Sequence, residues 1–299
     1  MQKGALGVLG CYVFWGMLPI FWKQLDAVNS IYILGCRIVW SVVFAVLLLA
    51  LRRNRFAEVR AILRDKPLCK RLTLAGITIC INWGMYIWAV TNGHIIDASL
   101  AYYLSPILTI LLGTVVCREK LSRIQWTAVA IALAGIVIAV IRYRRIPWVA
   151  LIIGGTFALY SALKKTVHTD SVAAVFAETL VLAPFALLLL LWMEVQGTGA
   201  IGVLHGWQWG LIPLAGVVTT VPLMLFSAGI QTTSMTLAGI LTYVSPTLQL
   251  LISVLLYQEE FTTTHAILFG FVWSGLVLYL VSGFLQERKH KNEEDTLCA

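Results

Sequence analysis

Two ionisable side chains lie inside long apolar segments, where a charge is costly. They are Arg37 and Glu178, which are 141 residues apart. A charge at the centre of a membrane helix costs about 2.5–3.5 kcal/mol on insertion scales, so such residues usually mark a substrate path, a proton relay or an ion pair. We interpret the two as contacts for a substrate, a proton or a gate. The alternative is a structural ion pair between packed helices, and the sequence leaves open whether the two side chains touch.

Uncharged polar and aromatic residues form a second candidate set. Asn82 and Tyr86 are four residues apart and therefore share one face of a helix. The other members of the set are Trp88 and Asn92 on the same segment, Tyr102 and Ser105 on the next, Thr242, Ser245 and Gln249 near the C-terminus, and Trp15 and Tyr160. We interpret these residues as the lining of a cavity for a flat or cationic organic solute, because aromatic faces attract cations. Hydrogen bonding between helices is the alternative interpretation.

The elements that carry these residues are apolar. The 299-residue chain is 60% hydrophobic and 12% charged, with a mean hydropathy of +0.87, whereas soluble domains carry about 25% charged residues. This composition predicts an all-α integral membrane protein. Ten windows are long enough to cross a bilayer, at 4–22, 30–51, 72–91, 98–116, 124–141, 147–163, 172–193, 208–228, 236–257 and 265–285. Segment 52–71, with Phe56, Val59 and Leu63 at helical spacing, is either a helix on the membrane surface or a solvated linker.

The positive charge indicates topology rather than nucleic-acid binding. With the N-terminus inside the cell, 17 of the 22 lysines and arginines fall in inner segments. Because cytoplasmic loops are enriched in these residues, both termini should be cytoplasmic. The cluster Arg142, Arg144 and Arg145, which would lie on the outer side, is the exception and could contact lipid phosphates.

The two halves of the chain resemble each other at an offset of 140 residues. The matches are Leu74-Ala75-Gly76 with Leu214-Ala215-Gly216, Tyr103-Leu104-Ser105-Pro106 with Tyr243-Val244-Ser245-Pro246, and Gly135 with Gly275. Each repeat has five spans, so the second copy enters the membrane inverted. The predicted domains are 1–145, 146–285 and a cytoplasmic tail, 286–299. Inverted repeats are typical of secondary transporters, whose substrate site lies between the halves.

Three smaller features also repeat or suggest contacts. Pro106 and Pro246 predict a pair of kinks. Glu119 and its repeat mate Glu259 are interpreted as end caps or surface ion pairs. The small residues Ala128, Ala132 and Gly135 could weakly favour a helix–helix dimer, so the chain is expected to be a monomer or a weak homodimer.

Several site types are missing from the sequence. It has no G-x-x-x-x-G-K-[ST] loop, which argues against direct use of ATP. The six cysteines form no C-x-x-C pair, and the five histidines do not cluster, so no metal site, cofactor or disulfide framework is expected. We predict that the protein is not an enzyme. A lipid-processing membrane enzyme would need a nucleophile–base pair or paired carboxylates at one depth.

Five motifs resemble those of the RarD family, an EamA-like branch of the drug/metabolite transporter superfamily. They are Arg37-Ile38-Val39-Trp40-Ser41, the run from Asn82 to His94, Arg118-Glu119-Lys120-Leu121-Ser122-Arg123, Phe157-Ala158-Leu159-Tyr160 and Val221-Pro222-Leu223-Met224-Leu225-Phe226. The similarity covers nearly the whole chain in the same order. It implies ten helices in two inverted repeats in a bacterial inner membrane. Cys36 departs from the pattern, because the resemblance implies histidine at this position. If that histidine carries protons in the family, this chain lacks the group.

We therefore expect a secondary transporter of a small organic metabolite or drug-like solute that works by alternating access. Both export and uptake are open. Proton coupling through Glu178 and uniport are also both open. A membrane sensor that binds a small ligand without flux is the alternative.

Overall fold

The computed structural model describes residues 3–52, 56–92, 94–143 and 147–258, together with positions 266, 270, 273, 274 and 277. Within these residues every regular element is a helix. The long helices are α1 (Lys3–Trp22), α2 (Ser30–Ala50), α4 (Lys66–Thr91), α5 (Ile95–Val116), α6 (Arg123–Tyr143), α7 (Trp148–Lys165), α8 (Ser171–Val195) and α9 (Leu211–Thr232). The shorter ones are α3 (Ala57–Arg64), α10 (Met235–Leu241), α11 (Val244–Leu255) and the 3₁₀ helices η1 (Lys23–Leu25) and η2 (Gly206–Gly210).

Helices occupy the nine predicted windows that fall among the described residues. Six helical segments there are long and apolar enough to cross a membrane: Lys3–Leu25, Ser30–Ala50, Lys66–Thr91, Ser171–Val195, Gly206–Thr232 and Met235–Leu255. Leu100–Val116 is a shorter apolar helix. Most of window 265–285, the tail 286–299, Glu259 and the side chains of the Arg142–Arg145 cluster lie outside the described residues. Ten spans therefore stay a prediction.

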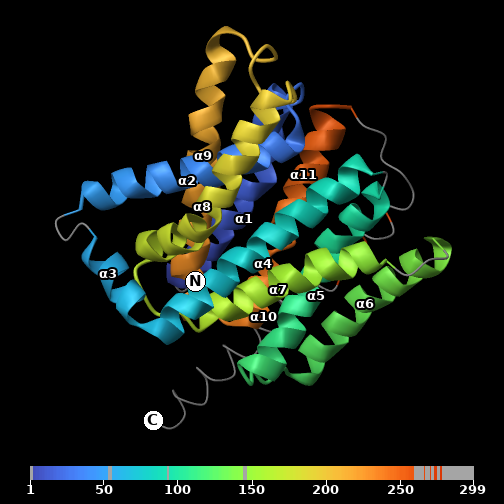
Figure 1. Ribbon diagram of the computed structural model, residues 1–299. Helices are drawn as coiled ribbons and strands as arrows, with labels where there is room; N and C mark the ends of the chain where they lie inside the picture. Colours follow the sequence, from blue (N-terminus) through green and yellow to red (C-terminus); the bar gives the residue numbers. More distant parts are fainter. Residues whose placement is uncertain are drawn as a thin grey trace.

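The helices form one bundle, with α3 and α6 at opposite edges (Figure 1). In the first half, α1 packs against α9 and α11, and α2 packs against α8 and α9. In the second half, α7 packs against α4 and α5, and α8 packs against α2 and α4. Each half therefore makes most of its long contacts with the other half. The core lies along the seam between them.

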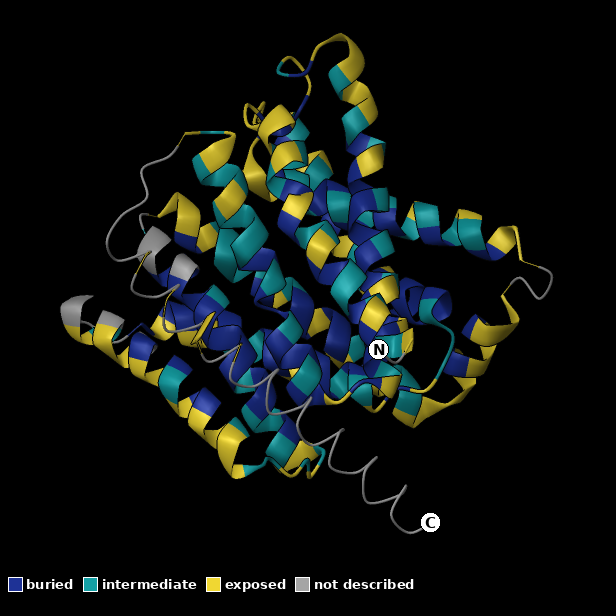
Figure 2. Cartoon of the chain, turned by 180° about the vertical axis from the view of Figure 1, so that it is seen from behind, coloured by how far each residue is buried: buried dark blue, intermediate teal, exposed yellow. Residues whose placement is uncertain are grey.

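The outer surface of the bundle is apolar. On α8, for example, Phe185 is 72% exposed, Leu188 65% and Trp192 60%. Figure 2 shows buried positions along the middle of the bundle and exposed positions on its outer faces and helix ends. Such a surface would be costly in water and is suited to lipid contact.

Short polar residues set where several helices begin. The side chains of Asn29, Asp65, Asp170 and Ser234 each accept a hydrogen bond from a backbone N–H in the first turn of the helix that follows. These are favoured N-cap residues because they satisfy donors that have no partner within the helix. The Asp65 cap explains why α4 begins at Lys66, six residues before the predicted window.

Segment 52–71 contains a short helix, α3, rather than only a linker. In α3, Val59 and Ile62 are buried, while Phe56 packs its ring 6.3 Å from that of Phe176. The predicted apolar face was partly wrong, because Leu63 is 58% exposed and Ile62 takes the inward position. A helix of eight residues has only two turns, so a small change in its rotation moves one residue out of the interface.

The ninth predicted window is two helices rather than one. α10 ends at Leu241 and α11 begins at Val244, two residues before Pro246. Proline has no N–H to donate and its ring clashes with the carbonyl four residues earlier, here that of Thr242. Pro106, the repeat mate, lies inside the unbroken α5. The two prolines therefore differ in their local effect.

The small residues of α6 face the protein's own core. Ala128 and Ala132 are 4% and 5% exposed and belong to the cluster that includes Val129 and Leu104. This stripe is therefore not available to a second copy of the chain. The prediction that it favours a dimer loses its basis.

A close helix crossing makes Gly76 sensitive to substitution. A methyl group at Gly76 would lie 2.6 Å from the backbone oxygen of Glu178. We expect Gly76→Ala to lower the free energy of unfolding by about 1–3 kcal/mol, because α4 and α8 would have to separate. Gly84→Ala, on the same helix, is the control, since a methyl group there meets nothing within 4 Å. Denaturant unfolding in detergent measures both, and equal effects would contradict the prediction.

Candidate functional site

A cavity of about 220 Å³ lies between the two halves. Its walls come from α1, α2, α4, α5, α7, α11 and the break between α10 and α11. Nine of the thirteen predicted site residues line it: Trp15, Arg37, Asn82, Tyr86, Tyr102, Ser105, Thr242, Ser245 and Gln249. All nine come from positions near the middle of their helices or nearer the end where η1 and the α4–α5 connection lie. The cavity therefore lies toward the end of the bundle that carries η1 and the α4–α5 connection.

The helix break contributes polar groups to this wall. The Thr242 hydroxyl donates to the Ala238 carbonyl at 3.0 Å, and the Gln249 amide donates to the Ser245 hydroxyl at 3.2 Å. The Gln249 amide also lies 3.4 Å from the Trp15 carbonyl on α1. Opposite, the Asn82 amide donates to the Ile153 carbonyl at 2.6 Å. The bonds from Gln249 to Trp15 and from Asn82 to Ile153 each join a helix of one half to a helix of the other.

Arg37 is held by aromatic rings rather than by a carboxylate. Its guanidinium carbon lies 4.2 Å from the centre of the Trp83 ring and 5.0 Å from that of Trp22. Its Nε donates to the Thr219 hydroxyl at 3.1 Å. Within the part of the chain that the structure describes, no acidic side chain lies within 4.0 Å of it. Two cation–π contacts partly replace the hydration that the charge loses.

Below the cavity an aromatic cluster fills the bundle. Tyr12 and Phe157 line the cavity and pack against Phe226, with ring centres 6.1 and 6.0 Å apart. Tyr160 stacks on Phe226 at 5.7 Å. The sequence predicts Tyr160 as a cavity residue, but its side chain is fully buried and does not line the cavity.

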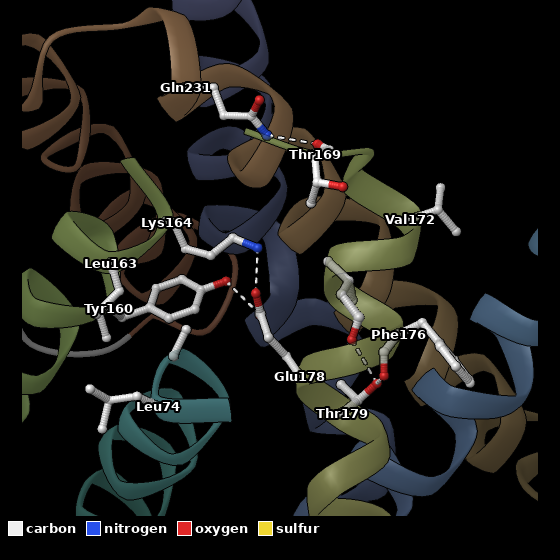
Figure 3. Close-up of polar contacts among 12 residues, drawn as sticks. Leu74, Tyr160, Leu163, Lys164, Thr169, Val172, Phe176, Glu178, Thr179 and Gln231 are labelled. Carbon is white, nitrogen blue, oxygen red and sulfur yellow. Dashed lines mark hydrogen bonds and ion pairs between the residues drawn. The ribbon is translucent and has the colours of Figure 1, made fainter. Parts of the chain in front are cut away.

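Glu178 lies deeper still and pairs with Lys164 (Figure 3). The two side chains are 2% and 0% exposed, and the Tyr160 hydroxyl also donates to the carboxylate at 3.4 Å. The sequence left open a pair between Glu178 and Arg37, and the partner is Lys164 instead. The sequence does not single out Lys164 as this partner, because it stands at the end of an apolar run, where lysines also mark cytoplasmic loops.

The remaining predicted residues, Trp88 and Asn92, lie at the end of α4 outside the cavity. Trp88 is 38% exposed, stacks on His94 at 5.0 Å and lies 5.7 Å from Trp148. Asn92 ends α4, and its amide donates to the Trp88 carbonyl at 2.9 Å. Both residues therefore make contacts at the C-terminal end of α4 rather than in the cavity.

Glu119 caps a helix of the opposite half, as one of its two interpretations predicted. Its carboxylate accepts from the backbone N–H of Met235 at 2.6 Å and of Thr236 at 2.9 Å, and from the Thr236 hydroxyl. Carboxylates are favoured at helix N-termini because the N–H groups there have no partner within the helix.

A capping aspartate outside the spans carries a shifted pKa. Burial alone raises the pKa of Asp170, but hydrogen bonds from Arg52 and from the N–H groups of Ala173 and Val172 outweigh it. The pKa of Asp170 therefore lies below its ordinary value. The Arg52 Nη1 is 2.6 Å from the carboxylate.

We expect Asp170→Asn to lower stability by at most about 1 kcal/mol at pH 7, because the pair with Arg52 is partly exposed and asparagine remains a good cap. A lowered folded pKa stabilises the protein above the unfolded pKa, about 3.9, and this contribution is lost as pH falls through the folded value. The difference between wild type and variant should therefore shrink progressively as the pH falls below about 4. Unfolding midpoints from pH 3 to 7 measure it, and a constant difference would contradict the prediction.

The comparisons with known proteins agree with this geometry. Residues 2–141 and 146–281 each match the EamA-like transporter family. The chain is 38% identical to the uncharacterized transporter YojE of Bacillus subtilis, over 97% of this chain and 98% of that protein. It is 35% identical to the protein RarD of Streptomyces exfoliatus, over 93% and 88%, and 29% identical to that of Escherichia coli strain K12, over 96% and 97%.

One crystal structure that is 17% identical has a TM-score of 0.71 and covers 93% of this chain and 96% of its own. This likeness shows a shared fold. The resemblance to RarD proteins is thus confirmed over most of the chain. The family and the apolar helices also indicate a multi-pass bacterial membrane protein. The chain belongs to the EamA-like transporter family.

Proposed function

We propose that this protein is a secondary transporter that carries a small organic metabolite or drug-like solute across the bacterial inner membrane by alternating access. The observation that carries the proposal is the cavity at the seam of the two halves, lined by Arg37, neutral polar groups and aromatic rings. Relatives named as transporters support the class. The proposal includes no enzymatic step.

Reciprocal packing supports two copies of one unit, 1–145 and 146–285. The contact of α1 with α9 has its counterpart in that of α7 with α4, and the contact of α1 with α11 has its counterpart in that of α7 with α5. A twofold relation between the halves requires such pairs. The relation is inverted if each half contributes five spans.

The backbone conformation gives further support for a twofold relation between the halves. Arg118 and Gln258, 140 residues apart, are the non-glycine residues with positive φ in the described part of the chain, at 55° and 54°. Each follows the end of a helix, α5 or α11. Gly76 and Gly216, also repeat mates, each meet the backbone of a helix from the other half, at Glu178 and Trp40.

The cavity and the filled layer beneath it define the proposed outward-facing state. With both termini cytoplasmic, the cavity lies in the periplasmic half. The aromatic cluster around Phe226 and the Lys164–Glu178 pair then close the cytoplasmic half. In the opposite state these contacts separate, while residues of the periplasmic half come together.

Proton coupling and uniport are both consistent with this arrangement. Glu178 is the proposed carrier if protons drive transport, because protonation would remove its charge from Lys164 and weaken the cytoplasmic closure. Wild-type proteoliposomes with an imposed pH gradient distinguish the two. If a transported solute accumulates in the vesicles and a protonophore abolishes this accumulation, transport is coupled to protons. If the solute only equilibrates and does not respond to the pH gradient, the protein is a uniporter.

A mixture of solutes tests transport across several chemical classes at once. Proteoliposomes are loaded with a defined mixture of organic acids, amino acids, amines, neutral aromatics and chloramphenicol, and the retained solutes are measured by mass spectrometry. We expect selective loss of at least one class without ATP, compared with protein-free vesicles. The same solutes are tested for their ability to raise the melting temperature of the purified protein. If the vesicles retain every solute that raises it, the protein binds ligands without transporting them, which supports a sensor.

A further inference from the structure

We infer that the cavity binds a small organic monoanion with a flat apolar body, such as an aromatic carboxylate. This inference names the substrate class and rests on the proposed transport function. Its basis is the charge on Arg37, which no carboxylate of the described residues balances within 4.0 Å.

The guanidinium has hydrogen-bonding capacity left for a ligand. Its Nε donates to Thr219, whereas its two terminal nitrogens donate to no described residue. Arg37 is only partly buried, and it lines the cavity. A planar guanidinium matches a carboxylate in shape and can donate two parallel hydrogen bonds to it.

The same surroundings disfavour a cationic or zwitterionic solute. Among the described lining residues, Arg37 is the charged one, and no acidic side chain is present to receive an ammonium group. The faces of Trp22 and Trp83 already hold the guanidinium. This changes the expectation from the sequence, in which the aromatic walls suited a flat or cationic organic solute.

The remaining walls suit a flat ring of modest size. Tyr86 and Tyr102 meet edge to face at 5.6 Å, and Trp15 and Phe157 meet in the same way at 5.9 Å. Edge and face contacts of this kind favour aromatic ligands. A volume of about 220 Å³ is below the range of about 300–1,000 Å³ that holds drug-sized ligands. A single-ring carboxylate is therefore a suitable probe.

Binding to the full chain in nanodiscs tests the inference. The probes are benzoate, its neutral analogue benzamide, its cationic analogue benzylamine and the zwitterion phenylalanine, each followed by thermal shift and by titration. We expect benzoate alone to stabilise the protein. In Arg37→Gln the dissociation constant should rise about 10- to 100-fold, because a charge-assisted hydrogen bond is lost. Arg37→Lys should recover only part of the affinity, since it keeps the charge without the fork.

The matched control is Lys23→Gln. Lys23 is a cation at the same end of the bundle, but it is 57% exposed and pairs with Asp26 at 3.3 Å outside the cavity. This variant should bind benzoate as wild type does. Size-exclusion profiles and melting temperatures without ligand identify a variant that has lost its fold. In that case the wild-type preference for benzoate over benzamide decides the question.

The inference is overturned if benzoate does not bind, if benzamide binds as well as benzoate, or if Arg37→Gln leaves the benzoate affinity unchanged. Competition by phosphatidylglycerol, seen when it replaces phosphatidylcholine in the nanodisc, would assign Arg37 to lipid headgroups and also overturn it. Benzoate that binds but does not cross proteoliposome membranes would leave the ligand class standing and contradict transport. Neutral or cationic solutes that cross while anions do not would do the reverse.

Discussion

Replacing Glu178 with leucine is expected to lower the free energy of unfolding by about 3–5 kcal/mol, because it leaves Lys164 buried and charged without a partner. Both side chains are almost fully inaccessible, so neither water nor a rotation to the surface can relieve the loss. Tyr160 would also lose the acceptor for its hydroxyl. Unfolding of the purified protein in mixed detergent, followed by circular dichroism, measures the effect.

The double variant Lys164→Met with Glu178→Leu distinguishes an unpaired charge from a simple loss of packing. Removing both charges should restore most of the lost stability, since a buried ion pair contributes little over an apolar pair of similar size. If the double variant is as unstable as the single one, the loss of side-chain packing around Glu178, rather than the unpaired charge, accounts for the lower stability. If the pair also closes the cytoplasmic half, the double variant should still expose that side more often to thiol-reactive probes.

Replacing Glu119 with alanine should cost about 2–4 kcal/mol, because three hydrogen-bond donors at the start of α10 lose one shared acceptor. The damage should be local. Hydrogen exchange at Met235 and Thr236 should accelerate more than exchange in α8. Glu119→Gln should be intermediate, since its amide oxygen retains part of the acceptor capacity.

Glu58→Ala is the control for this variant, because Glu58 is exposed on α3. It should change stability by less than about 0.5 kcal/mol. A uniform increase in exchange across the bundle for Glu119→Ala would mean that the carboxylate supports the whole fold rather than the cap of one helix.

Apolar windows predicted the helices well. A segment that spans the membrane must be long and continuously helical, because its backbone N–H and C=O groups find no water there and must bond to each other. The same method could not find the break at Leu241–Val244. Averaging over a window hides a proline whose effect depends on local packing, as the unbroken α5 around Pro106 shows. Apolar windows also leave out the polar first turns of α4, which begins at Lys66 after the cap at Asp65.

The cavity was predictable where polar residues share a helical face. Asn82 and Tyr86 lie four apart and both line it, whereas Trp88 is six residues from Asn82 and projects from another side of α4. Partners on other helices could not be predicted. Lys164 and Glu178 are 14 residues apart on different helices, and no sequence spacing relates Arg37 to Trp22 and Trp83.

The missing counter-charge at Arg37, among the residues that the structure describes, has a consequence for energetics in a living cell. The Lys164–Glu178 pair is neutral as a unit, so the membrane potential exerts little net force on it. Arg37 carries a full charge, and moving one elementary charge across 100 mV is worth about 2.3 kcal/mol. The membrane potential would thus act on an empty carrier whenever Arg37 shifts within the electric field. A bound anion would neutralise the charge of Arg37, so the potential would act little on the loaded carrier. Measurement of the transport current would show which of these two states moves the charge.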